Sequence, residues 1–215
     1  MRIAVVGSQN VGKSTFISDF LNNWPMYKKS GDSYRKLVKK KNLTLNKEGS
    51  EESQGIILEA LLKETRKYKK KENIIHDRIA LDNLIYTMWL KDRYPDKISD
   101  LFVEKTIHKV KRSFDEIDLI MYLPHIEKYS IQMEERENRE VDVVYREEID
   151  NIFKAVFQTY LDHKSWFFDF QSKKGVPAVV EIFGNREERI EMAKLYINPD
   201  GSSYSEDESL ISDIN

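Results

Sequence analysis

The segment Gly7-Ser-Gln-Asn-Val-Gly-Lys-Ser14 constrains the fold of this chain more than any other feature. It matches the pattern G-x-x-x-x-G-K-[ST] in full, between a β-branched run at 2–6 and a helical pattern at 14–21. In this setting the two glycines let the backbone wrap around a phosphate, so that N–H groups and the positive end of the next helix face the anion. We therefore predict a phosphate-binding loop that consists of Gly7, Ser8, Gln9, Asn10, Val11, Gly12, Lys13, Ser14 and Thr15.

Two side chains of this loop have predicted chemical tasks. The Lys13 ammonium is expected to bridge the β- and γ-phosphates of a nucleoside triphosphate, and the Ser14 hydroxyl is expected to bind Mg²⁺.

Strand and helix patterns alternate along the chain. Further strands are predicted at 73–76, 118–123 and 178–183, each a short apolar run. Helices are predicted at 34–40, 51–71, 80–91, 99–112, 141–161 and 186–196. This alternation predicts an α/β fold with a parallel sheet that is covered on both faces, and ligands bind at the carboxyl ends of such strands.

Composition limits the class of protein. A chain of 215 residues fits one domain, and the absence of cysteine excludes disulfides and thiolate zinc sites. No apolar run approaches the about 18 residues that a membrane span requires. We expect a cytoplasmic protein without a membrane segment (in the host cytoplasm if the source is viral).

The net charge of −2 conceals segregated charges. Residues 28–47 and 63–71 are rich in lysine and arginine, whereas 134–150 and the end of the chain are acidic. Such segregation is compatible with a polyanionic partner near the basic segments and equally with solvated helix faces.

Asp77 and Arg78 follow the predicted strand 73–76, at an edge where chemistry is expected. The Asp77 carboxylate could orient Mg²⁺ or accept the proton of an acceptor hydroxyl, and Arg78 could hold a phosphate. The alternative is a helix-capping aspartate beside a surface arginine.

The acidic segment 134–150 contains Arg136, Arg139 and Arg146. These arginines could form a lid that neutralises charge on the transferred group. The alternative is an acidic helix with ion pairs four residues apart, such as Asp142 with Arg146.

With these elements in order, the chain resembles the P-loop nucleoside and nucleotide kinases. It looks most like the branch with the ribosylnicotinamide kinase domain and small phage or bacterial ATP-binding relatives. The resemblance covers residues 1–197 and rests on Gly7–Thr15, Asp77-Arg78, Asp118–Leu123, Asn138-Arg139 with Asp142 and Arg146, and Val180–Gly184 followed by Arg186–Arg189.

The resemblance implies a P-loop NTPase fold, a three-layer α/β/α arrangement with about five parallel strands. It also implies ATP as the donor with Mg²⁺, an acceptor-binding region at about 24–72 and a lid at about 130–150. Composition separately predicts an acidic, disordered tail at 198–215. The family commonly has a glutamate three residues before an arginine near the acceptor hydroxyl; here the counterpart is Asp32 before Arg35, one methylene shorter. The expected site therefore has four groups of residues. The catalytic residues are Lys13, Asp77, Asp32 and Arg139, and the metal ligands are Ser14 and Asp77. Arg136 and Arg146 bind the donor, and the acceptor contacts are Arg35, Gln54, Arg78 and Tyr34.

Three functions remain open at this point. The leading hypothesis is a kinase that phosphorylates a hydroxyl of a nucleoside or nucleotide-like acceptor. An alternative places the acceptor hydroxyl on nucleic acid, such as a 5-hydroxymethylated pyrimidine in phage DNA, because phosphate tracking would use segments 28–47 and 63–71. A third is a P-loop ATPase switch without an acceptor; a GTPase is disfavoured because Leu123-Pro-His-Ile stands where an N-K-x-D segment is expected. The sequence leaves the oligomeric state open.

Overall fold

The computed structural model describes residues 1–31, 33–129, 142–161, 167–168 and 176–204, without the side chains of residues 33–35 and 161. Within these ranges one parallel sheet has the strand order β2-β3-β1-β4-β5. Its strands are β1 (Arg2–Val6), β2 (Lys28–Lys29), β3 (Ile74–Asp77), β4 (Leu119–Tyr122) and β5 (Ala178–Glu181). The parallel sheet of about five strands is therefore confirmed.

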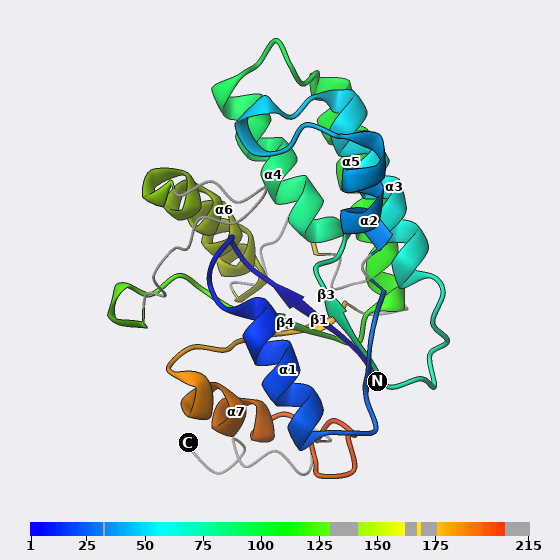
Figure 1. Cartoon of the computed structure of the whole chain (residues 1–215), viewed down its shortest axis with the longest axis vertical. Helices are drawn as coiled ribbons and strands as arrows, with labels where there is room; N and C mark the ends of the chain where they lie inside the picture. The colour runs from blue at the N-terminus through cyan, green and yellow to red at the C-terminus, as the bar shows by residue number, and fades with distance from the viewer. Residues whose placement is uncertain (32, 130–141, 162–166, 169–175, 205–215) are drawn as a thin grey trace.

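Helices cover both faces of this sheet (Figure 1). They are α1 (Lys13–Asn23), α2 (Ser33–Lys41), α3 (Glu51–Thr65), α4 (Ala80–Arg93), α5 (Asp100–Ser113), α6 (Val143–Leu161) and α7 (Arg186–Lys194). Because side chains alternate along a strand, β1 directs Ile3 and Val5 toward α1 and α7, and Ala4 and Val6 toward the helices on the other face. The three-layer α/β/α arrangement is confirmed as well.

Most element ends lie within two residues of the prediction, and three features differ by more. The exposed pair Lys28–Lys29 forms an edge strand that its polar sequence does not indicate. Helix α3 ends at Thr65 instead of residue 71, because the chain turns after Glu64, whose carbonyl accepts the N–H of Lys67 at 3.2 Å.

The third difference concerns the expected tail at 198–215, whose first part packs against the body of the protein. The Trp24 indole donates to the Asn198 carbonyl at 2.9 Å, and the Tyr27 hydroxyl donates to the Gly201 carbonyl at 2.6 Å. Residues 198–204 thus belong to the folded unit, and the expected tail at 205–215 lies outside the described residues.

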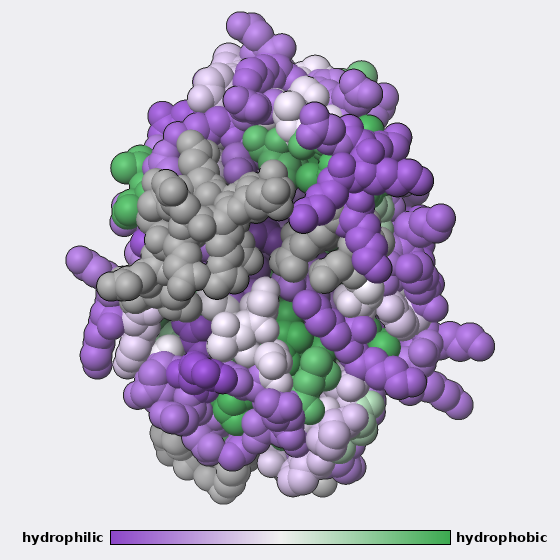
Figure 2. Space-filling model, in the orientation of Figure 1, coloured by the Kyte–Doolittle hydropathy of each residue, from purple (hydrophilic) through white to green (hydrophobic). Residues whose placement is uncertain are grey.

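The visible surface in Figure 2 is mostly hydrophilic, and its apolar groups form separate small areas. In the described ranges, every helix is too short or too polar to cross a bilayer.

Candidate functional site

The predicted phosphate-binding loop lies at the carboxyl end of β1, where the backbone adopts conformations that favour glycine. Gly7 has φ 142°, Asn10 has φ 58° and Gly12 has φ 85°. A Cβ atom on Gly7 would lie 2.5 Å from the carbonyl oxygen of Leu123, which follows β4. The absence of a side chain at Gly7 therefore lets the loop lie directly against the adjacent strand end.

Lys13 and the start of α1 complete the predicted phosphate-binding loop. The buried Lys13 ammonium donates to the Gly7 carbonyl at 2.8 Å and also to the Ser8 carbonyl. Gly12 caps α1 without a side-chain hydrogen bond, and the first turn contains no acidic residue. The N–H groups of this turn and the positive end of the helix dipole are thus available to an anion.

Asp77 lies next to this loop, as predicted, at the carboxyl end of the adjacent strand β3. Its Oδ2 atom is 3.4 Å from the Ser14 Oγ atom and 3.3 Å from the Lys29 Nζ atom. Asp77 does not cap the next helix, since α4 begins after Ile79. Ser14 and Asp77 present oxygen atoms close together, the donor type that Mg²⁺ prefers, so these residues fit the expected metal.

Arg78 follows Asp77 in a left-handed conformation with φ 75°, which is uncommon for residues other than glycine. Its guanidinium is 3.3 Å from the Asp82 carboxylate and lies over the Tyr86 ring at 5.4 Å. Burial raises the pKa of Asp82, and the nearby Arg78 and Lys13 oppose that rise. Asp82 was not predicted; the signal for it was its position four residues after Arg78 on a helical pattern.

A buried polar network lies on the β4 side of the loop. Asp150 of α6 accepts the Tyr122 hydroxyl at 2.8 Å and the His125 N–H at 3.0 Å. Arg146 lies one turn earlier, is only 4% exposed, and has Nε and Nη1 without partners among the described residues. Burial lowers the pKa of His125, and the Arg146 charge lowers it further. This buried guanidinium lies near the end of β4, the strand next to the one that leads into the P-loop. Its open N–H donors suit it to an anionic ligand.

The turn after β5 is tied to the P-loop by Arg189 of α7. Its Nε donates to the Gly184 carbonyl at 2.9 Å and its Nη1 to the Val11 carbonyl at 2.8 Å. Arg189 is thus committed to the backbone of both segments and fixes them relative to each other.

Only some of the residues predicted for the acceptor side lie in the described part of the chain. Gln54 is buried between α3 and α4, where its Oε1 accepts the Asn83 amide at 2.7 Å. Its role in acceptor binding stays a prediction. Asp32, the side chains of Tyr34 and Arg35, and the lid residues Arg136 and Arg139 lie outside the described part of the chain.

Asp142 at the start of α6 pairs with Lys47, whereas the alternative interpretation of this segment paired it with Arg146. This pairing lowers the pKa of Asp142. Since Lys47 lies between α2 and α3, the ion pair connects this segment with the start of α6.

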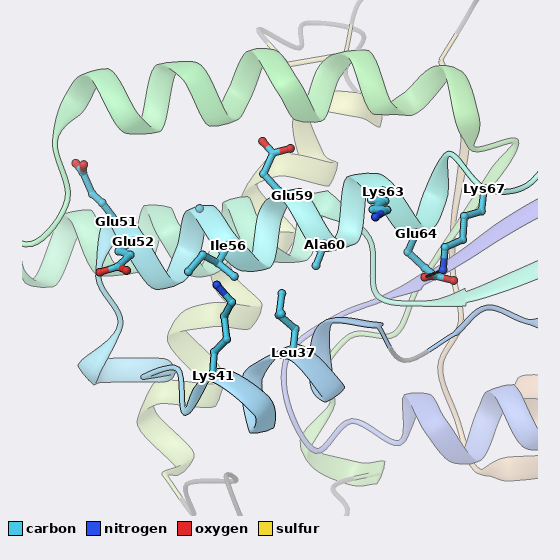
Figure 3. A pocket seen from close by; sticks show the side chains of 11 residues that line it. Leu37, Lys41, Glu51, Glu52, Ile56, Glu59, Ala60, Lys63, Glu64 and Lys67 are labelled. Carbon is cyan, nitrogen blue, oxygen red and sulfur yellow. Dashed lines mark hydrogen bonds and ion pairs between the residues drawn. The ribbon is translucent and has the colours of Figure 1, made fainter.

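A separate groove of about 760 Å³ lies between α3 and α2, and Figure 3 shows the side chains that line it. Helix α3 directs Gln54 and Leu58 toward α4, whereas Ile56, Ala60 and Lys63 line the groove. None of the described P-loop residues lines it. The groove is therefore distinct from the phosphate site.

No family model and no curated protein matches this sequence. Among solved structures, the chain is similar to deoxyadenosine kinase from M. mycoides, with 18% identity and a TM-score of 0.61 over 90% of this chain and 96% of that one. It is also similar to thymidylate kinase from Candida albicans, with 16% identity, a TM-score of 0.58 and coverage of 95% and 97%.

A third similar structure is the NadR protein in complex with NR, with 14% identity and a TM-score of 0.62; 95% of this chain matches 53% of that one. These similarities show that the chain has the fold of the P-loop nucleoside and nucleotide kinases. The resemblance suggested by the sequence is confirmed at that level.

Proposed function

We propose that this protein is a kinase that transfers the γ-phosphoryl group of ATP, with Mg²⁺, to a hydroxyl of a nucleoside or nucleotide-like acceptor. The observation that carries the proposal is the position of Asp77, 3.4 Å from the P-loop hydroxyl of Ser14. A phosphate-binding loop and a carboxylate on the adjacent strand end are the two parts that phosphoryl transfer requires. The named nucleoside and nucleotide kinases of similar fold support the acceptor class.

Each part of the site has a task in this reaction. The loop backbone and Lys13 hold the β- and γ-phosphates, and Arg146 contributes a further cation. Ser14 and Asp77 would hold Mg²⁺, which neutralises charge on the phosphates when it is bound. The acceptor oxygen forms a bond to the γ-phosphorus while the bond to the bridging oxygen breaks and ADP leaves. The acceptor proton passes to a carboxylate, for which we assign Asp77, with Asp32 as a second carboxylate on the acceptor side.

The proposed domain plan follows the same division. Residues 1–197 form the proposed kinase domain, against which residues 198–204 pack, with acceptor binding at about 24–72 and a lid at about 130–150 that includes Arg136 and Arg139. Tyr34, Arg35, Gln54 and Arg78 are the proposed acceptor contacts. We place the protein in the cytoplasm.

A transfer assay tests the proposal. Radiolabelled phosphate from γ-labelled ATP should move to an acceptor in a panel of nucleosides, nucleotides and modified DNA. Lys13→Ala should abolish transfer because it removes the ammonium that binds the phosphates, whereas the exposed Lys194→Ala on α7 should not. Asp77→Asn should lower kcat far more than ATP affinity. Undiminished transfer by Lys13→Ala would refute the proposed site.

The same assay separates the alternatives. Label found only as free phosphate, without stimulation by any acceptor, would indicate a P-loop ATPase switch. Transfer only to DNA, with a steep dependence of binding on salt that is lost on neutralising Lys39, Lys40 and Lys41, would indicate a nucleic-acid kinase. Segment 63–71 lends this alternative less support, because it leads into the amino end of β3 while the site is at the carboxyl end.

A further inference from the structure

Lys29 is the last residue of β2, and its side chain reaches Asp77. Its Nζ is 3.3 Å from the Asp77 Oδ2 atom, and about a third of its side chain is exposed. Lys28 is the other residue of the same strand, and successive side chains of a strand point to opposite faces. Lys29 therefore differs from the surrounding surface lysines of the basic segment 28–47, among which the sequence did not distinguish it.

The strand order places Lys29 on the acceptor side of Asp77. The P-loop follows β1, Asp77 ends β3 and Lys29 ends β2, in the sheet order β2-β3-β1. Neighbouring strands are about 4.8 Å apart, so the backbone of Lys29 lies about 10 Å from the P-loop strand. The donor phosphates occupy the P-loop side, and a ligand group that meets Lys29 beyond Asp77 belongs to the acceptor.

Two hydrogen bonds hold the backbone directly after Lys29. The N–H of Ser30 donates to the Ile75 carbonyl at 2.9 Å, and the N–H of Gly31 donates to Glu64 Oε1 at 2.9 Å. Glu64 is 4% exposed and also accepts the Tyr68 hydroxyl at 3.0 Å. Figure 3 shows Glu64 on α3, at the end of the groove near Lys67. A cation on a backbone fixed in this way is preorganised for a ligand.

The charges near Asp77 fit an anionic acceptor. Lys29 ends β2 and Arg78 directly follows β3, and the left-handed backbone of Arg78 is the kind of local strain found at ligand sites. The proposed reaction engages the Asp77 carboxylate with the metal and the acceptor proton, which leaves the Lys29 ammonium to another anion. A neutral nucleoside supplies no such group, whereas a phosphate does.

We propose that Lys29 binds a phosphate of the acceptor, so that the acceptor is a phosphorylated nucleoside and not a neutral one. This inference rests on the proposed function. Two sources share this chemistry, a free nucleoside monophosphate and a nucleotide unit within a strand.

Calorimetric binding in the presence of the non-hydrolysable donor AMP-PNP tests the assignment. The ligands are nucleosides, their 5′-monophosphates and short single-stranded oligonucleotides. Lys29→Met keeps the length of the side chain and removes the charge, and Lys28→Met on the same strand is the matched control. We expect Lys29→Met to weaken binding of the phosphorylated ligand by roughly tenfold or more, the size of a charge-assisted hydrogen bond. Nucleoside and AMP-PNP binding should be unchanged, and Lys29→Arg should restore much of the loss.

The ligand that shows the selective loss identifies the source of the phosphate: the monophosphate if the acceptor is free, the oligonucleotide if it is part of a strand. Wild-type protein that binds no phosphorylated ligand more tightly than its nucleoside would overturn the assignment. The assignment would also be overturned if Lys29→Met weakened the binding of nucleosides and of phosphorylated ligands equally. An effect of Lys28→Met as large as that of Lys29→Met would overturn it as well. Absence of phosphoryl transfer together with the selective loss would instead refute the proposed reaction and leave the phosphate site standing.

Discussion

His76 makes the stability of this protein depend on pH in a way that can be isolated. The side chain is 1% exposed on β3, and its Nε2 atom has no hydrogen-bond partner among the described residues. The Tyr68 ring lies across it at 5.6 Å. Burial lowers the pKa of His76 from 6.5 to about 4; the nearby Glu64 opposes this shift and Arg2 adds to it.

The sign and size of the effect follow from proton linkage. Between pH 4 and pH 6.5 the unfolded chain binds a proton at His76 that the folded protein does not, so stability rises with pH in this window. The full contribution is present above pH 6.5 and is lost as the pH falls toward 4. At 1.36 kcal/mol for each pH unit, the loss amounts to about 3 kcal/mol.

Urea unfolding at several pH values between 4.5 and about 7 measures this contribution as the difference between wild type and a variant. His76→Gln removes the titrating group, so its free energy of unfolding should fall less steeply on acidification than that of the wild type. The exposed His108→Gln on α5 serves as the control and should follow the wild type. Parallel curves for wild type and His76→Gln would refute the reasoning.

Two further substitutions test close backbone contacts. Gly7→Ala should destabilise the protein by at least about 1–3 kcal/mol and weaken ATP binding in calorimetry, since its Cβ would lie 2.5 Å from the Leu123 oxygen. Gly55→Ala, whose Cβ would lie 3.6 Å from its nearest neighbour, should leave both measurements unharmed, and equal behaviour of the two variants would contradict the argument. Tyr27→Phe should lower the free energy of unfolding by about 1–2 kcal/mol in urea, because the Gly201 carbonyl loses its buried donor; an unchanged midpoint would show that this contact contributes nothing.

The placement of the candidate phosphate-binding loop beside Asp77 could be predicted because the local sequence patterns suffice. The P-loop motif specifies backbone geometry within nine residues, and β3 is an apolar run that ends at Asp77. Parallel strands bring their carboxyl ends to one edge, so the proximity of Ser14 and Asp77 followed without knowledge of the packing.

The parts that could not be predicted depend on contacts distant in sequence. Strand β2 consists of two lysines and exists because β3 offers it hydrogen bonds. Lysines within a basic run look alike in sequence, and only the sheet order separates Lys29 from Lys28. Asp142 pairs with Lys47, 95 residues away, where the helical spacing suggested Arg146.

The brevity of β2 also bears on how the protein behaves in concentrated solution. Among the described strands it is one of the two edges of the sheet, where unpaired backbone groups can add a strand from another molecule and start aggregation. Two exposed lysines on so short a strand oppose that addition by charge repulsion. Replacing both lysines with β-branched residues would favour a longer edge strand and remove its positive charge. The segment that presents Lys29 therefore also protects the protein against edge-to-edge pairing with other molecules.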